Sequence, residues 1–260
     1  MSQRPTALVT GASSGIGEQL ARLLSADHDL VLVARNQQVL ERLAHELESA
    51  QGASVEVLPA DLATTGGVDA VVGRVADGAP LDMVVNNAGF GWFGNLVDQD
   101  PEAVAAMVAV DVTAVALLSR AALQGMVARR RGSLLNVSST ASFVPGPHAA
   151  VYHAAKAFVT SLTEALHEEV RPHGVHVTAL CPGFTPTGFQ QRAGVVDGSS
   201  PVPAFVVTDA RTVAVAGLAA AARNDAVCVP GAFNRLGQVG THLAPRSVVR
   251  RISGRVLARF

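Results

Sequence analysis

Short apolar runs alternate with longer amphipathic stretches along almost the whole chain. The runs are rich in β-branched residues and predict strands, whereas the stretches between them carry apolar residues at helical spacing. Near-continuous apolar strands separated by helices are typical of a parallel sheet joined by right-handed crossovers. The pattern predicts a doubly wound α/β fold of about seven strands with helices on both faces. The predicted strands are Thr6–Thr10, Leu30–Ala34, Val55–Leu58, Met83–Val85, Ser133–Val137, Val175–Leu180 and Val227–Val229.

Two segments depart from this alternation. Residues 184–206 hold glycines, serines and prolines that break any long element, and long loops in compact domains are often functional, so we expect a substrate lid here. Residues 244–260 form a basic amphipathic tail. For this tail, a helix packed on the domain with solvated arginines is favoured over contact with a membrane surface or with an anionic carrier on the substrate. Its apolar positions are Val249, Ile252, Val256 and Phe260, and its arginines are Arg246, Arg250, Arg251, Arg255 and Arg259.

Length and charge narrow the class of protein. A chain of 260 residues with 49% hydrophobic residues is long enough for one sizeable core and short for two enzyme domains, so a single domain over residues 1–260 is expected. The 20 Lys and Arg against 21 Asp and Glu give a net charge of −1, so the protein as a whole has no positive electrostatic field that would attract nucleic acid. Almost all of the positive charge is arginine. The only lysine is Lys156, and the only tyrosine is Tyr152.

The cysteines and the apolar stretches indicate where the protein is found. Cys181 and Cys228 both lie in apolar runs, and neither has a cluster of potential metal ligands beside it, so we expect two buried thiols and no metal site. Free thiols of this kind are typical of proteins in a reducing cytoplasm. The N-terminal residues show no ordered sequence of charged segment, apolar stretch and cleavage site. The longest apolar stretch, Val213–Ala222, has about half of the ~20 residues that span a membrane. A cytoplasmic protein is therefore expected.

A glycine-rich turn follows the first predicted strand and leads into a helical pattern. Glycine permits a tight turn and lets a pyrophosphate approach the helix N-terminus, whose unpaired N–H groups and dipole favour anions. An ordinary glycine turn is the alternative, but its place after the first strand of an alternating chain favours a Rossmann-like dinucleotide site. The residues of this turn are Gly11, Ser13, Ser14, Gly15, Ile16 and Gly17.

The spacing Gly-x-x-x-Gly-x-Gly in this turn resembles that of the short-chain dehydrogenase/reductase family. The similarity extends to later segments, each of which follows a predicted strand. It implies an adenine-side contact, the family's Asn-Ala-Gly motif and a nicotinamide-side turn. The corresponding residues are Asp61 and Leu62 for the first, Asn87, Ala88 and Gly89 for the second, and Pro182, Gly183, Thr185 and Thr187 for the third.

The end of the second predicted strand bears on the choice of cofactor. An NAD enzyme needs an acidic residue there for the ribose 2′-hydroxyl, but this chain has Ala34 and Arg35. A guanidinium binds a 2′-phosphate bidentately, so NADP(H) is preferred over NAD(H). The alternative is that Arg35 is a solvated strand end.

The candidate chemical groups follow the fifth predicted strand. Tyr152 and Lys156 are four residues apart in a predicted helix, which puts both side chains on one face. A neighbouring ammonium favours the phenolate and is expected to lower the tyrosine pKa, so Tyr152 can act as acid or base. The family resemblance implies that Ser139, rather than Ser138, holds the substrate oxygen. It also implies that Tyr152 and Lys156 contact the cofactor, with Lys156 holding the nicotinamide ribose. In isolation, the tyrosine and lysine would be an ordinary surface pair.

One position departs from the family pattern. The family usually has an asparagine in the helix after Asn-Ala-Gly, where it shapes the backbone for a proton-relay water, and here Asp111 occupies that place. Aspartate lacks the amide donors. The relay is then altered, slowed or dependent on pH, or else Asp111 is a structural substitute with no kinetic effect.

Aromatic residues in the predicted loops indicate an apolar substrate pocket at the carboxyl ends of the strands. Lid or interface packing is an equal alternative for each of them. They are Phe90, Trp92, Phe93, Phe143, Phe184, Phe189 and Phe205.

The leading functional hypothesis is an NADP(H)-dependent oxidoreductase that acts on a hydrophobic ketone, aldehyde or secondary alcohol. The rival is a non-catalytic NADP-binding regulatory or interaction protein on the same fold, since the fold alone does not confer activity. Asp111 gives this rival some weight, whereas the presence of Ser139, Tyr152 and Lys156 together argues against it. The family resemblance further implies a homodimer or homotetramer.

Overall fold

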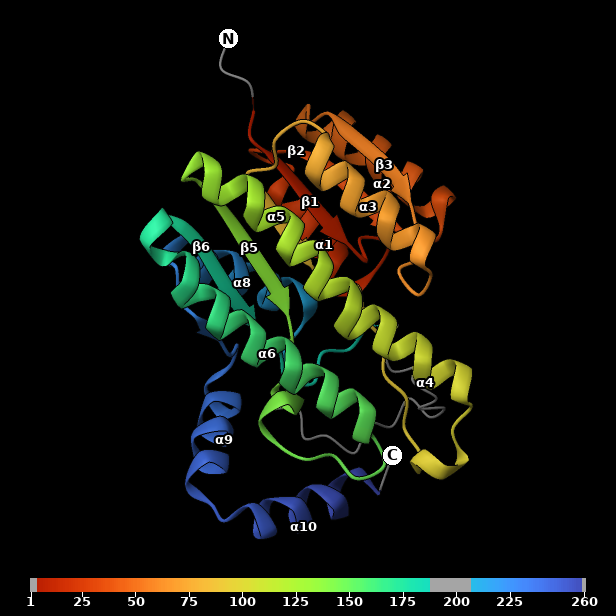
Figure 1. Ribbon diagram of the computed structural model, residues 1–260, viewed down its shortest axis with the longest axis vertical. Helices are drawn as coiled ribbons and strands as arrows, with labels where there is room; N and C mark the ends of the chain where they lie inside the picture. Colours follow the sequence, from red (N-terminus) through yellow and green to blue (C-terminus); the bar gives the residue numbers. More distant parts are fainter. Residues whose placement is uncertain (1–3, 188–206, 259–260) are drawn as a thin grey trace.

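The alternating pattern produces the predicted parallel sheet (Figure 1). The computed structural model describes residues 4–187 and 207–258. Its seven strands are parallel and lie in the order β3-β2-β1-β4-β5-β6-β7. The strands are β1 (Thr6–Thr10), β2 (Asp29–Ala34), β3 (Val55–Pro59), β4 (Met83–Asn86), β5 (Gly132–Val137), β6 (Val175–Leu180) and β7 (Val227–Cys228).

Helices connect these strands, and several begin at a side chain that caps the first turn. Asn36, Thr64, Asp100 and Asp209 each accept a hydrogen bond from a backbone N–H of the turn that follows, as expected for N-cap residues. The α-helices are α1 (Gly15–Leu24), α2 (Gln37–Gln51), α3 (Thr65–Asp77), α4 (Pro101–Val108), α5 (Val115–Arg129), α6 (Ala150–Val170), α8 (Ala210–Arg223), α9 (Ala232–Leu243) and α10 (Arg246–Leu257). Shorter helical turns are η1 (Leu96–Asp98), η2 (Ala109–Ala114), η3 (Thr140–Phe143) and η4 (Arg171–His173).

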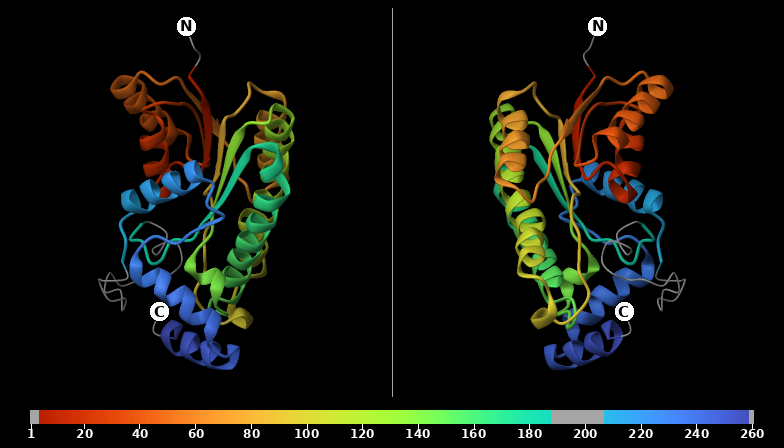
Figure 2. Two further views of the ribbon diagram at one scale, coloured as in Figure 1. Left: turned by 90° about the vertical axis from the view of Figure 1, so that its left-hand side faces the viewer. Right: turned by 90° about the vertical axis from the view of Figure 1, so that its right-hand side faces the viewer.

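The sheet is covered on both faces (Figure 2). On one face α1, α2 and α8 bury Leu20, Leu40 and Val213 against the strands. On the other face α3, α5 and α6 close a second core that includes Leu118 and Met126. Because both faces are covered, the central strands are mostly apolar, which explains why they were visible in the sequence as near-continuous apolar runs; Asn86, Asn136 and Thr178 are buried polar exceptions.

Among the described residues, one helix is long and apolar enough to cross a membrane by length and composition. It runs from Pro101 to Arg129 through α4, η2 and α5. Its residues Leu118, Ala122 and Met126 are buried in the second core, which is how a core helix of an α/β domain behaves. The sequence did not single it out, because polar residues interrupt its apolar positions.

The sheet order places the site. The chain leaves β1 toward β2 and β3 on one side and returns to β4 on the other, so the loops after β1 and β4 diverge at the carboxyl edge. Open α/β sheets bind ligands at such a switch point. The carboxyl-terminal helices α9 and α10 lie beyond the same ends of the strands (Figures 1 and 2).

Some expectations need correction. Cys181 is a buried thiol as predicted, but Cys228 is only half-buried, because β7 is a short edge strand. The basic tail predicted over 244–260 contains the helix α10, and a further helix that the sequence analysis did not describe, α9, precedes it. Most of the predicted lid, together with Phe189, Phe205, Arg259 and Phe260, lies outside the described residues.

Candidate active site

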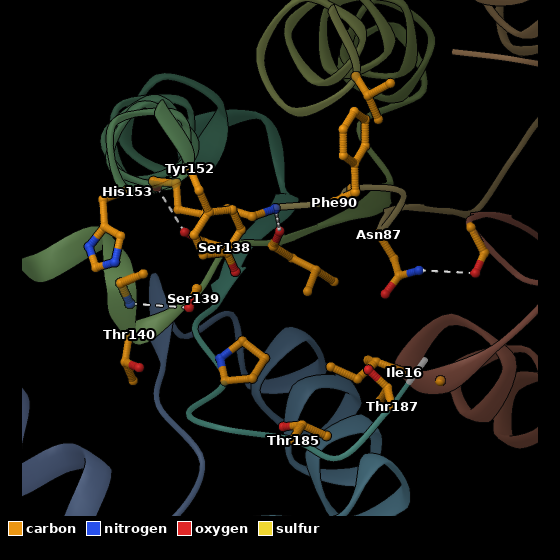
Figure 3. A pocket seen from close by; sticks show the side chains of 18 of the residues that line it. Ile16, Asn87, Phe90, Ser138, Ser139, Thr140, Tyr152, His153, Thr185 and Thr187 are labelled. Atoms are coloured by element: carbon orange, nitrogen blue, oxygen red, sulfur yellow. Dashed lines mark hydrogen bonds between the residues drawn. The ribbon is translucent and has the colours of Figure 1, made fainter. Parts of the chain in front are cut away.

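A cavity of about 1230 Å³ opens at the carboxyl ends of the central strands (Figure 3). Almost every residue predicted to contact a cofactor or substrate lines it, although these residues come from seven separate segments of the chain. Among the predicted cofactor-binding and catalytic residues, Gly17 and Asp111 do not line it, and both are buried. The lining residues that the sequence predicted are Gly11, Ser13, Ser14, Gly15, Ile16, Arg35, Asp61, Leu62, Asn87, Ala88, Gly89, Ser139, Tyr152, Lys156, Pro182, Gly183, Thr185 and Thr187.

The glycine-rich turn between β1 and α1 adopts a backbone conformation that requires glycine. Gly11 and Gly15 have φ angles of 67° and 63°, in the left-handed region. A Cβ on Gly17 would overlap the carbonyl of Gly11 and the side chain of Asn87. The turn therefore brings bare backbone and the N-terminus of α1 to the cavity wall, which suits a pyrophosphate. The residues present fit the dinucleotide that the fold implies.

Asn87 braces this turn from the neighbouring strand. Its Nδ2 donates to the carbonyl oxygens of Thr10 at 2.9 Å and Gly11 at 3.3 Å. The hydroxyl of Thr10 in turn accepts from the N–H groups of Asn87 and Ala88, each at 3.0 Å. Asn87 thus joins the loops after β1 and β4, a structural task that the sequence prediction of a cofactor contact did not include.

Gly17→Ala is expected to destabilise the fold by about 1–3 kcal/mol, since the added methyl group overlaps backbone that cannot move aside. Thermal unfolding measures this. The matched control is Gly73→Ala in α3, where an added Cβ meets nothing within 4 Å, and a gain of up to about 1 kcal/mol is expected there. Equal stability changes for the two variants would show that the turn tolerates a side chain.

The end of the cavity that the sequence predicted for the adenine is formed by the ends of β2 and β3. Arg35 is exposed immediately after β2, and it forms no ion pair with any residue in the described part of the chain. Asp61 orders the loop after β3, because its Oδ1 accepts from the N–H of Ala63 at 3.0 Å. Leu62 is buried beside it. This arrangement leaves the Arg35 guanidinium available to an anion.

The candidate chemical groups meet on the opposite side of the cavity. Figure 3 shows Tyr152, on α6, beside Ser139, which follows β5. Ser139 begins η3 by accepting from the N–H of Ala141 at 3.1 Å. Ser138 is buried, and its hydroxyl is engaged by Thr160 at 2.7 Å and by the carbonyl of Lys156 at 2.9 Å. This geometry favours Ser139 over Ser138 as the hydroxyl available to a substrate.

Lys156 forms a buried ion pair with Asp111. The distance from Nζ to Oδ1 is 2.7 Å, and the two side chains are only 6% and 0% exposed. The other oxygen, Oδ2, accepts from the N–H of Phe90 at 3.1 Å. A Cβ on Gly89 would come within 2.6 Å of Asp111 Oδ1 and 3.1 Å of Lys156 Nζ, so the glycine of Asn-Ala-Gly gives the pair its space. The carboxylate therefore contacts the lysine directly.

The helix that carries Asp111 is locally widened. Residues Ala109–Ala114 form η2, a π-helical segment between α4 and α5. Such segments are rare and frequently occur at functional sites, because they shift a side chain relative to a regular helix. The sequence showed no signal for it. The widening lies at the one position where the chain departs from the family pattern.

Burial and the two charges decide the ionisation of Tyr152. Burial raises the pKa of Tyr152, while the charge of Lys156 and a hydrogen bond with Ser139 lower it and the charge of Asp111 raises it. Lys156 lowers the pKa as predicted, but burial outweighs it and the net pKa lies above the ordinary value, so the predicted net lowering was wrong. Burial lowers the pKa of Lys156, but Asp111 and Tyr152 raise it above its usual value, which keeps the ammonium charged.

The predicted aromatic wall is present in part. The side chains of Phe90, Trp92, Phe93 and Phe184 line the cavity. Phe143 does not line it, because η3 turns this ring into a small cluster with Cys181 and Val229.

A comparison with protein families identifies the group. The short chain dehydrogenase model matches residues 5–195, which is most of the chain. The chain belongs to the short-chain dehydrogenase family. This short-chain dehydrogenase is accordingly an oxidoreductase of a family that binds a nicotinamide cofactor, as the sequence resemblance implied.

Relatives of this short-chain dehydrogenase match over most of its length. An uncharacterized oxidoreductase from Myxococcus xanthus is 40% identical over 188 residues, which are 71% of this chain and 73% of that protein. A short-chain dehydrogenase from Sphingobium yanoikuyae in complex with NADPH has a TM-score of 0.83 and 33% identity, covering 92% of this chain and 94% of that one. A bulky-bulky ketone specific alcohol dehydrogenase from Comamonas testosteroni has a TM-score of 0.79 and 30% identity, covering 93% and 94%.

The sequence prediction missed one wall of the cavity in this short-chain dehydrogenase. The helices α9 and α10 close the end beyond Tyr152, with side chains or backbone from both helices in the lining. Apolar residues at helical spacing in the tail were the available signal, but they were interpreted as packing on the domain. The lining residues of these helices and of the turn between them are Gly237, Gly240, Thr241, Ala244, Val248, Val249, Ile252, Ser253, Val256 and Leu257.

Proposed function

We propose that the protein is an NADP(H)-dependent oxidoreductase that interconverts a hydrophobic ketone or aldehyde and the corresponding alcohol. The observation that carries this proposal is the meeting of Ser139, Tyr152 and Lys156 at one cavity with a glycine-rich turn on its far wall. The aromatic residues and the apolar side of α10 give the substrate end of the cavity its hydrophobic character.

The residues perform the reaction through proton transfer and orientation. The nicotinamide, when bound, supplies the hydride for the carbonyl carbon. Ser139 Oγ donates a hydrogen bond to the carbonyl oxygen, and Tyr152 Oη donates the proton that converts this oxygen to a hydroxyl. The Lys156 ammonium, whose Nζ is 5.7 Å from the centre of the tyrosine ring, stabilises the phenolate that remains. In the reverse direction the phenolate removes the alcohol proton.

The preference for NADP(H) rests on Arg35. Its side chain is exposed at the end of β2, the position where an NAD enzyme would carry a carboxylate. The related dehydrogenase from Sphingobium yanoikuyae is in complex with NADPH. A guanidinium favours the additional phosphate of this cofactor.

Arg35→Ala is expected to raise the KM for NADPH by about 10-fold or more and to leave the KM for NADH nearly unchanged, since a lost charged hydrogen bond costs about 1.5–3 kcal/mol. Initial rates with both cofactors measure this. Arg42→Ala, an exposed arginine of α2, is the matched control. Equal effects on the two cofactors would contradict the assignment.

The first test of the function itself is the oxidation of NADPH by a panel of hydrophobic ketones and aldehydes. Turnover that is faster with NADPH than with NADH supports the proposal. The rival, a non-catalytic NADP-binding protein, is favoured if NADPH binds tightly and no carbonyl in the panel is reduced.

A further inference from the structure

The helix α10 presents an apolar stripe to the substrate end of the cavity. Val248, Ile252 and Val256 are four residues apart along the helix and therefore share one face. All three line the cavity, yet they are 42%, 55% and 51% exposed. A helix that merely covered the domain would bury this face. The stripe therefore offers apolar surface to whatever occupies the cavity.

The same helix concentrates positive charge beside this stripe. Residues 226–260 carry six arginines and no acidic residue, whereas the remaining 225 residues carry 14 Lys and Arg against 21 Asp and Glu. Four of the six lie on α10, and all four are exposed. None of these four forms an ion pair within residues 4–187 and 207–258. They are Arg246, Arg250, Arg251 and Arg255.

Two of these arginines adjoin the stripe. Arg251 follows Val248 by three positions and Arg255 follows Ile252 by three, so each is a surface neighbour of a cavity-lining residue. Arginine side chains keep the charged end in water while the stem lies along apolar surface. The guanidinium groups are thus available at the edge of an apolar wall.

We propose that α10 recognises an amphipathic substrate whose apolar chain lies along Val248, Ile252 and Val256 and whose carboxylate is held by Arg251 and Arg255. This inference rests on the proposed function, since it assigns the substrate class of the same cavity. A lipid surface fits less well, because a docking helix turns its apolar face away from its own domain, whereas this stripe lines the cavity. An oxo fatty acid has the required chemistry.

The test compares 9-oxodecanoate with its methyl ester, which has the same chain and the same ketone without the charge. Binding is followed by the fluorescence of Trp92, the only tryptophan in the chain and a residue of the cavity wall. At low salt we expect the acid to bind about 10-fold more tightly than the ester, because a hydrogen bond between charged groups strengthens binding by about a factor of ten or more. The preference should shrink at high salt.

The variants distinguish an effect of Arg251 and Arg255 from a general effect of removing positive charge from the protein surface. The double variant Arg251→Gln/Arg255→Gln should abolish the preference for the acid and leave ester binding unchanged. The control is Arg42→Gln/Arg120→Gln, which removes two exposed arginines from α2 and α5 and should keep the preference. A preference that survives in the first double variant, equal binding of acid and ester, or binding of neither overturns the proposal.

Two further results distinguish the alternatives. If the protein sediments with phosphatidylglycerol vesicles through Arg251 and Arg255 while acid and ester bind equally, α10 contacts lipid and the proposal is wrong. Fluorescence needs no turnover, so the preference for the acid can be measured even if NADPH is never oxidised. A failure to oxidise NADPH would count against the proposed function and not against this inference. Reduction of the ester without any preference for the acid overturns this inference and leaves the proposed function standing.

Discussion

Tyr152→Phe is expected to lower kcat for carbonyl reduction by about 10³-fold, within the range that general acid catalysis contributes. The variant keeps the ring and loses only the hydroxyl, and no other tyrosine exists in the chain to replace it. Stopped-flow or steady-state oxidation of NADPH with the best ketone of the panel measures the loss. Thermal unfolding should change by no more than about 1 kcal/mol, because the variant keeps the packing of the ring and loses one hydrogen bond, that with Ser139.

The serines provide the control. Ser139→Ala should also reduce kcat, since its hydroxyl lies beside Tyr152, whereas Ser138→Ala should mainly reduce stability, because Ser138 bonds Thr160 and the Lys156 carbonyl. Retention of more than about a tenth of the rate in Tyr152→Phe would exclude the phenol as the principal acid.

Asp111→Ala is expected to cost about 3–5 kcal/mol of stability, because it leaves the buried ammonium of Lys156 without its partner. Denaturant unfolding of the parent and the variant measures this. The matched variant Asp111→Asn keeps the volume and a hydrogen-bonding oxygen, and it restores the residue that the family usually has. It should therefore lose less stability than Asp111→Ala.

Asp111→Asn also has a defined effect on pH dependence. The charge of Asp111 raises the pKa of Tyr152, so removing this charge lowers that pKa. Alcohol oxidation requires the phenolate, whose population rises with pH through this pKa; the midpoint of the oxidation profile should therefore move to lower pH. With one tyrosine in the chain, the ultraviolet absorbance of the phenolate reports the same shift without turnover. A midpoint that stays in place or moves upward would contradict a role for Asp111 in setting the acidity of Tyr152.

The sequence predicted the features that short segments determine by themselves. The strands could be located because burial on both faces makes them mostly apolar, and the glycine-rich turn because its left-handed backbone at positions 11 and 15 favours glycine. The position of Arg35 followed from the end of its strand. For these features the local pattern is sufficient.

Other features depend on tertiary contacts and could not be predicted in the same way. Whether Asp111 contacts Lys156 depends on how η2 packs against α6, and these two residues are far apart in the chain. The pKa of Tyr152 rises because burial outweighs one favourable charge, and a motif of five residues contains no measure of burial. The helical pattern of α10 was visible, but the surface that its apolar face meets was not.

Because the chain has a single lysine, the only lysine side chain that a reagent can modify lies in the candidate active site. Acylating reagents that modify lysines on most proteins find a single side-chain target here, and that target, Lys156, is buried and held in an ion pair. Mild labelling or attachment to a solid support through surface lysines will therefore fail, and forcing conditions should inactivate the protein in proportion to the label found on Lys156 itself. If the bound dinucleotide protects Lys156 from such labelling, the fraction of protein left unlabelled at this residue would measure the fraction of sites that the dinucleotide occupies.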